Sequence, residues 1–160
     1  MSIGEKILDE IGDALKLIKT DNNYSFDLPD EYINRGYISK EKVNTYPTAY
    51  YELGDDENEM EGSADDIEDV KLNAAIGIYF ECDSGQGNLS TMGEQIRADI
   101  KAFLHQYNHV KPNCLYFKTV PEVHGWEYLR SSVLLDEGQN KGLMAVIFQI
   151  RYRLFPNQQN

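Results

Sequence analysis

Residues 70–82 read VKLNAAIGIYFEC, and every second side chain in this stretch is apolar. The apolar set lies on one side of the alternation: Val70, Leu72, Ala74, Ile76, Ile78, Phe80 and Cys82. Because successive side chains of a β-strand point to opposite faces, this spacing predicts one long strand with a single buried face. Such a strand needs neighbouring strands for its backbone and a second layer over its apolar face, so the rest of the chain must supply both.

Two stretches with helical periodicity can form that second layer. Residues 3–18 follow Ser2 and Glu5, which have the spacing of a capping box, and Thr91 and Glu94 repeat that spacing before the second stretch. Each stretch carries one apolar stripe: Ile3, Ile7, Ile11, Ala14, Leu15 and Ile18 in the first, and Met92, Ile96, Ile100, Phe103, Leu104 and Tyr107 in the second. A single stripe predicts a helix that packs on one side only.

Five further stretches are predicted as strands, and residues 30–46 between them are predicted as a long connection because they lack a clear period. The five stretches are residues 24–28, 48–53, 114–120, 128–135 and 143–155. The order is α-β-β-β-α-β-β-β. The sequence therefore predicts an α+β fold, with two helices packed on one face of a mainly antiparallel β-sheet. A length of 160 residues favours a single domain over 1–160.

An acidic stretch, residues 52–69, supplies most of the net charge of −12. It contains ten carboxylates and no Lys or Arg. Mutual repulsion among so many like charges predicts a solvated loop over residues 54–69. A sequence pI of about 4.6 has the wrong sign for phosphate contacts, so no specific nucleic-acid binding is expected.

The same stretch has the spacing of a calcium-binding loop. With Gly62 at the sixth position, Glu57, Glu59 and Glu61 fall at positions one, three and five, and Glu68 falls at position twelve. Position one normally requires the shorter Asp, and the flanking elements should be helices, whereas strands are expected here. We therefore predict no metal site. A solvated loop and an acidic arm that docks on a basic partner both remain open.

The spacing of the histidines predicts neither a catalytic site nor a metal site. His105 and His109 have the spacing of a zinc pair, but they lie opposite the apolar stripe of the second helix, and no further ligand follows at a matching spacing. His124 lies in a predicted loop near Trp126, and no nucleophile elbow accompanies it. We expect no catalytic residue, no cofactor and no enzymatic activity, and His124 and Trp126 are predicted to serve loop packing or a protein contact.

The chain shows no sign of a membrane or secretory location. It has no apolar run of about 18 residues, and its N-terminal residues carry acids instead of an apolar signal core. Cys82 and Cys114 lack metal-ligand or redox spacing, so they are predicted to be buried thiols in a reducing cytoplasm.

Five segments together carry a resemblance to a known family. They are IGEKILDEIGDALKLI (3–18), YPTAYYELGDDENE (46–59), VKLNAAIGIYFEC (70–82), MGEQIRADIKAFL (92–104) and AVIFQIRYRLF (145–155). In this order they resemble the tail terminator proteins of long-tailed bacteriophages, also called tail completion proteins. The resemblance is one of element order over nearly the whole chain, and residues 30–46 and 121–126 have no counterpart in it.

This resemblance implies a structural virion protein of the viral tail, made in the host cytoplasm, that caps the tail tube as a hexameric ring and joins it to the head-side neck. The implied partners are other copies of the chain, the tail tube protein and a neck or connector protein, with DNA passing through the lumen. The candidate protein contacts are Asp55, Asp56, Glu57, Glu59, Glu61, Trp126, Arg151 and Arg153. Lys101 on the second helix is expected to contribute to the same contacts as Arg151 and Arg153.

Three alternatives remain open on the sequence. The chain could be a neck or head-completion connector, which shares small α+β folds and ring assembly. It could be a monomeric binding module that uses the acidic stretch against a basic partner. A metal-dependent hydrolase is the third class, and it requires the acidic stretch to bind a metal ion.

Overall fold

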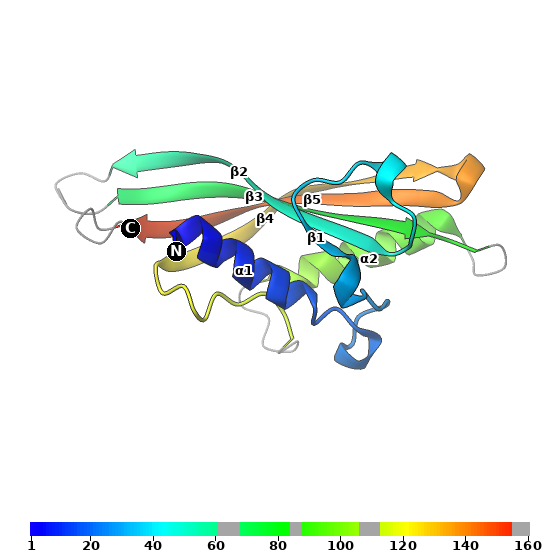
Figure 1. The fold of residues 1–160 in the computed structure, drawn as a ribbon, viewed down its shortest axis with the longest axis horizontal. Coiled ribbons are helices and arrows are strands. Elements are labelled where there is room, and N and C mark those ends of the chain that lie inside the picture. Colours follow the sequence, from blue (N-terminus) through cyan, green and yellow to red (C-terminus); the bar gives the residue numbers. More distant parts are fainter. Residues whose placement is uncertain (61–67, 84–87, 106–112, 155–160) are drawn as a thin grey trace.

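The computed structural model describes residues 1–60, 68–83, 88–105 and 113–154, and for residues 55–60 it describes the backbone alone. These residues form two α-helices, α1 (Ile3–Leu15) and α2 (Leu89–Phe103), which lie on the same side of one sheet (Figure 1). The strands are β1 (Ile33–Arg35), β2 (Thr48–Met60), β3 (Glu68–Glu81), β4 (Val123–Asp136) and β5 (Lys141–Leu154). The predicted fold class is confirmed: the protein is α+β, with two helices on a five-stranded, mostly antiparallel sheet.

The sheet has the order β1-β2-β3-β5-β4. β3 and β5 form its centre and pair antiparallel over their whole length, from Glu68↔Leu154 to Glu81↔Lys141. β2 and β4 flank them, also antiparallel, and the short β1 runs parallel to β2. The period-two stretch at residues 70–82 therefore lies in the middle of the sheet, where both of its edges are paired.

One face of the sheet, the covered face, packs against the helices. The even-numbered side chains of β3 and β5 lie there, and Ile76, Ile78 and Phe148 are almost completely buried. The stripes of α1 and α2 complete the same core with Ile11 and Ile100. The alternation in residues 70–82 is confirmed, because it corresponds to burial on this face.

The helix starts follow their capping residues. The Ser2 hydroxyl accepts a hydrogen bond from the Glu5 N–H at 3.1 Å, as the capping-box spacing predicts. The second start was predicted at Thr91, and this is wrong: α2 begins at Leu89, and the Asn88 side chain accepts from the Ser90 and Thr91 N–H groups. Asn is at least as good an N-cap as Thr, and the earlier start also buries Leu89.

Two predicted strands are wrong. Residues 24–28 and 114–120 form no strand and are instead loops that contact α1 and α2. Leu28 donates its N–H to the Ile18 carbonyl just after α1, and Leu115 donates to the Phe103 carbonyl at the end of α2. Their apolar side chains, including Phe117, enter the same core as those of the sheet. Packing against the helices buries their alternating apolar side chains as well as a place in the sheet would.

Two buried carboxylates hold these loops in place. Asp99 on α2 accepts hydrogen bonds from the Ser25 N–H, at 2.9 Å, and from the Ser25 hydroxyl. Glu10 on α1 accepts from the Thr119 N–H, at 3.1 Å, and from its hydroxyl. Both acids are less than 10% exposed, so each helix fixes one loop through charge-assisted hydrogen bonds.

The predicted connection over residues 30–46 contains a strand that sequence reasoning missed. β1 has three residues, which is too short for a period to show, and it pairs Ile33 with Ala49. The chain then crosses the second face of the sheet, which we call the open face because neither α1 nor α2 packs on it (Figure 1). There Val43 packs with Tyr50 and Tyr79 in a second, small apolar cluster.

The acidic stretch is largely strand, so the prediction of a loop over residues 54–69 is wrong. β2 continues to Met60 and β3 begins at Glu68, with a register shift between Leu53 and Asp56. The ladder pairs Glu57 with Lys71, so a cation lies opposite an acid at that point. Between the two strands only residues 61–67 remain, and they lie outside the described residues.

Candidate protein interface

β4 forms one edge of the sheet and pairs with β5 alone among the described strands. Edge strands present unpaired N–H and C=O groups to which another chain can add a strand. With bounds of Val123–Asp136, β4 is as long as the central strands. Its outer side is therefore an extended row of backbone donors and acceptors.

The direction of each backbone group follows from two hydrogen bonds at the ends of β5. Asn140 accepts from the Cys82 N–H on the β3 side, whereas Arg153 donates to the Glu122 carbonyl on the β4 side. Even-numbered residues of β5 therefore bond toward β3 and odd-numbered residues toward β4.

On β4 the partners of those odd-numbered residues include Arg130, Ser132 and Leu134, which bond inward. The residues between them must then point their N–H and C=O groups outward, away from β5. These are Ser131, Val133 and Leu135.

The side chains along this edge are unusually apolar for a solvent-facing strand. Leu129, at a register shift between Tyr128 and Arg130, is 44% exposed, and Leu134 is 60% exposed. Bulges and charges normally protect edges, and Arg130 and the shift at Leu129 supply some of that protection here. Two exposed leucines on one free edge nevertheless favour a protein contact.

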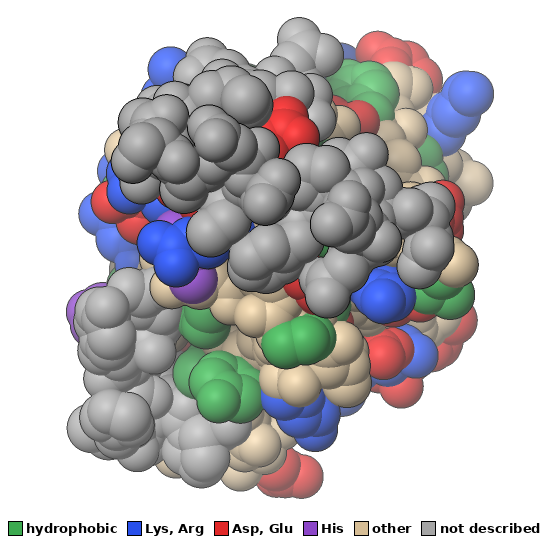
Figure 2. Space-filling model, turned by 90° about the vertical axis from the view of Figure 1, so that its left-hand side faces the viewer, with side chains coloured by type: hydrophobic (Ala, Val, Ile, Leu, Met, Phe, Trp, Pro, Cys, Tyr) green, Lys and Arg blue, Asp and Glu red, His purple; other side chains and the backbone are tan. Residues whose placement is uncertain are grey.

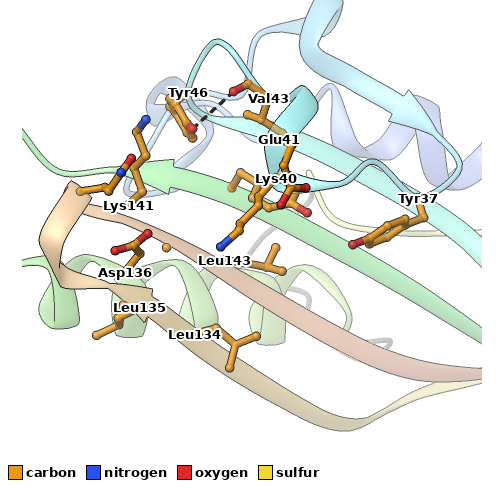
Figure 3. A pocket seen from close by; sticks show the side chains of 13 residues that line it. Tyr37, Lys40, Glu41, Val43, Tyr46, Leu134, Leu135, Asp136, Lys141 and Leu143 are labelled. Carbon is orange, nitrogen blue, oxygen red and sulfur yellow. Dashed lines mark hydrogen bonds between the residues drawn. The ribbon is translucent and has the colours of Figure 1, made fainter.

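A groove continues this edge onto the open face. It has a volume of about 640 Å³ and lies between residues 37–46 and the end of the β4–β5 hairpin (Figure 3). Tyr37, which is 62% exposed, and Leu134 stand at its rim, and Leu143 lies between them on β5. Since Leu134 belongs to both features, the edge and the groove form one surface, which we call the β4 surface.

Tyrosines fix the wall of the groove. The Tyr79 hydroxyl donates to the Ile38 carbonyl at 2.7 Å, which holds residues 37–46 against the sheet. Tyr50 packs beside it with ring centroids 6.1 Å apart. Burial raises the pKa of Tyr79 and of Tyr50 above the usual value for a phenol. Both hydroxyls therefore keep their protons well above neutral pH, and the charges of the groove come from other lining side chains, Lys40, Glu41, Asp136 and Lys141.

The opposite end of the open face carries ion pairs. The Asp69 carboxylate is 14% exposed and lies 3.1 Å from Arg153 Nε and 3.7 Å from His124 Nε2. Arg151 lies 3.6 Å from the Glu127 carboxylate. Figure 2 views this end, and red and blue side chains lie next to one another in its described part.

The predicted contact residues are therefore not all free for a partner. Arg151 and Arg153 are half exposed and already pair within the chain. Trp126 lies in β4 and not in a loop as predicted, and its ring packs edge-on against Phe117 at 5.1 Å. The ring of Trp126 therefore packs between β4 and the loop formed by residues 114–120, at the margin of the core.

The remaining predicted contacts lie in the acidic stretch. Asp55, Asp56, Glu57 and Glu59 are on β2, where the backbone alone is described, and Glu61 lies outside the described residues. The structure brings the first four together along one strand, near the ladder partner Lys71.

The histidines and cysteines form no metal site in the described residues. No group of three His, Cys, Asp or Glu side chains there could hold an ion. His105 is exposed just after α2, and His109 lies outside the described residues. Cys82 is buried as predicted, whereas Cys114 is only partly buried. Burial raises the pKa of the Cys114 thiol, which disfavours the reactive thiolate.

Comparison with known proteins does not assign the chain to a family. No protein-family model matches the chain, and no curated protein matches it either. Neither of the two described helices is both long and apolar enough to cross a membrane.

The β4 surface was missed by sequence reasoning, although one signal pointed to it. In residues 128–135, Arg130 and Ser132 mark the solvent side of the alternation, and Leu134 falls on that same side. A large apolar residue among polar ones on an exposed side is out of place unless something covers it. The groove could not be found, because it joins β4 to residues 37–46, far away in the sequence.

Proposed function

We propose that the chain is a structural assembly protein, and specifically a tail terminator subunit that caps a phage tail tube as a ring. The observation that carries the proposal is the outer edge of β4, which no described strand covers, with outward N–H and C=O groups at Ser131, Val133 and Leu135 and exposed leucines beside them. Such an edge binds another polypeptide through its backbone and needs no catalytic group.

The sheet also suits a closed ring. A ring forms when one surface of a subunit meets a different surface of the next subunit. The two edges of this sheet differ: β4 is long and partly apolar, whereas β2, with the short β1 beside it, is acidic. Because the two edges of the sheet differ, contact between the β4 edge of one copy and the β2 edge of the next is favoured, and a symmetric dimer is not. The element order that resembles tail terminators supports the tail tube as the further partner.

The experiment is to measure the solution mass by light scattering and to image the same fraction by negative stain. Closed rings of six 18.3 kDa chains, about 110 kDa, are expected, either alone or on purified tail tubes. A terminator should bind purified tubes in preference to a portal or connector, whereas a neck protein should show the opposite preference. Wild-type chains that neither form rings nor cap tubes would contradict the proposal.

An edge variant tests the carrying observation. Ser131→Pro removes one outward N–H, and proline is tolerated at edge positions where the N–H faces away from the sheet. Ser131→Pro also loses the hydrogen bond between the hydroxyls of Tyr128 and Ser131, so Ser131→Ala, which loses that bond and keeps the N–H, is the matched control. We expect Ser131→Pro to stop ring formation and Ser131→Ala to permit it.

A further inference from the structure

We infer that the β4 edge of one copy pairs with the acidic half of β2 of the next copy, as antiparallel strands. This inference rests on the proposed function, because it names the two surfaces that meet in the ring.

β2 has a free edge over its acidic half. β1 covers β2 only at residues 49–51, where Gly36 donates its N–H to the Tyr51 carbonyl at 2.7 Å. Odd-numbered residues of this part of β2 therefore point outward, and Leu53 does so beyond the end of β1. After the register shift, Glu57 and Glu59 bond toward β3, so the residues between and after them, Asn58 and Met60, point outward. No described strand pairs with that side.

The strand directions of the two edges are compatible. β4 is antiparallel to β5, β5 to β3, and β3 to β2. β4 therefore runs in the direction of β3 and opposite to β2. Copies that repeat with one strand direction join β4 to β2 as antiparallel strands, the pairing used throughout the centre of the sheet. Arg130 is level with Glu52 across the sheet, so the next copy must shift along the strands to bring Arg130 to the acidic half.

The two edges carry opposite charges at one position of β4, Arg130, whereas the acids of that strand, Glu127 and Asp136, lie on either side of it. The acidic half of β2 carries Asp55, Asp56, Glu57 and Glu59. On β4, Arg130 is exposed and makes no ion pair with any side chain that the structure describes. On α2 beside it, Lys101 Nζ lies 4.9 Å from the centre of the Tyr128 ring.

These charges also select between possible contacts. Two acidic β2 edges repel each other, so a symmetric contact between them is disfavoured. The arrangement favours contact of unlike edges, which is the kind of contact that closes a ring.

The test uses charge reversal on each edge of the full-length chain. Arg130→Glu changes β4, and the double change Glu57→Lys with Glu59→Lys changes β2. Lys16→Glu, at the half-exposed residue that follows α1, reverses one charge away from both edges and is the matched control for Arg130→Glu. Circular dichroism and thermal melts establish that every variant folds. We expect either edge variant to weaken ring formation about tenfold or more, and the control to leave it unchanged.

Mixing the two edge variants gives the sharper result. The intact β2 edge of one variant can meet the intact β4 edge of the other, and the two changed edges also carry opposite charges, so both junctions can form. We expect the mixture to form rings in which the two variants alternate, whereas each variant alone forms rings poorly. A chain that carries all three changes has exchanged its edge charges, and we expect it to form rings again.

The outcomes separate this inference from the proposed function. Rings that form equally well with Arg130→Glu and with Lys16→Glu, or a mixture of the two edge variants that forms no rings, would overturn the β4–β2 junction and leave a ring-forming terminator standing. A wild-type chain that neither forms rings nor caps tubes contradicts the proposed function and the junction with it.

Discussion

The two faces of this sheet are built from the same strands and differ in almost everything else. On the covered face, β3, β5 and both helices share one continuous apolar core that contains Phe148. On the open face there is a tyrosine cluster at one end, around Tyr79, and ion pairs at the other, around Asp69. Between them lie half-buried side chains such as Ile147. Stability therefore resides mainly on the covered face, while the open face and its edges remain available for contacts.

The largest expected effect compares neighbours on β5 that point to opposite faces. Phe148→Ala should lower the free energy of unfolding by about 3–5 kcal/mol, because it leaves a cavity among fully buried side chains. Ile147→Ala, on the open face, should cost about 1 kcal/mol, since less apolar area is lost from a half-buried site. Urea unfolding at pH 7 measures both. Equal costs would show that the open face is as closely packed as the covered one.

A second effect tests how tightly the tyrosine cluster sits on the sheet. A Cβ at position 77 would lie 2.0 Å from the Tyr50 ring, so Gly77→Ala should destabilise by about 1–3 kcal/mol. In a Tyr50→Ala background the same change should become nearly neutral. Gly138→Ala is the control, because its Cβ would meet nothing closer than 3.7 Å. Denaturant midpoints report all four variants, and additive costs would contradict the contact.

A third effect is a loss of stability at alkaline pH. Burial raises the pKa of Tyr79 on the open face and of Tyr24 beneath the helices. Above about pH 10 the unfolded chain releases these phenolic protons while the folded chain keeps them, so stability falls as the pH rises. Tyr79→Phe and Tyr24→Phe should each flatten the decline in melting temperature between about pH 9.5 and 11. Tyr116→Phe, which changes an exposed tyrosine, should leave the decline as it is.

The smallest effect concerns the ion pairs of the open face. Arg153 is half exposed and lies 3.1 Å from Asp69, so the pair should contribute about 0.5 kcal/mol, and less in high salt. A double-mutant cycle with Arg153→Met and Asp69→Asn isolates this contribution. A coupling energy several times larger would mean that the open face stabilises the fold more than its exposure suggests.

Sequence reasoning succeeded where local spacing reports burial directly. The alternation in residues 70–82, the apolar stripe of α1 and the Ser2 cap were all predicted and are all present. It failed at residues 24–28, whose alternating apolar side chains are buried against helices instead of joining the sheet. In residues 54–60, acidic composition argued for a loop, and pairing with β3 overrode that local preference.

The candidate interface was predictable only in part. The acidic residues were identified from composition, and their strand Thr48–Met60 is one side of the proposed junction. Arg151 and Arg153 were identified as contacts, and both already pair within the chain. The other side of the junction, the free edge of β4, depends on strand order, which no local pattern encodes.

The sequence by itself determined which side chains are buried, because a period of two or 3.6 residues separates an inner from an outer surface within one segment. Only the tertiary structure decided what covers them and which edges stay free. Residues 114–120 and β4 both alternate apolar with polar side chains. The first segment is nevertheless a loop that Glu10 of α1 holds by hydrogen bonds, whereas β4 is the edge strand of the sheet. That choice depends on contacts between distant segments, whose energies are absent from any single stretch of the chain.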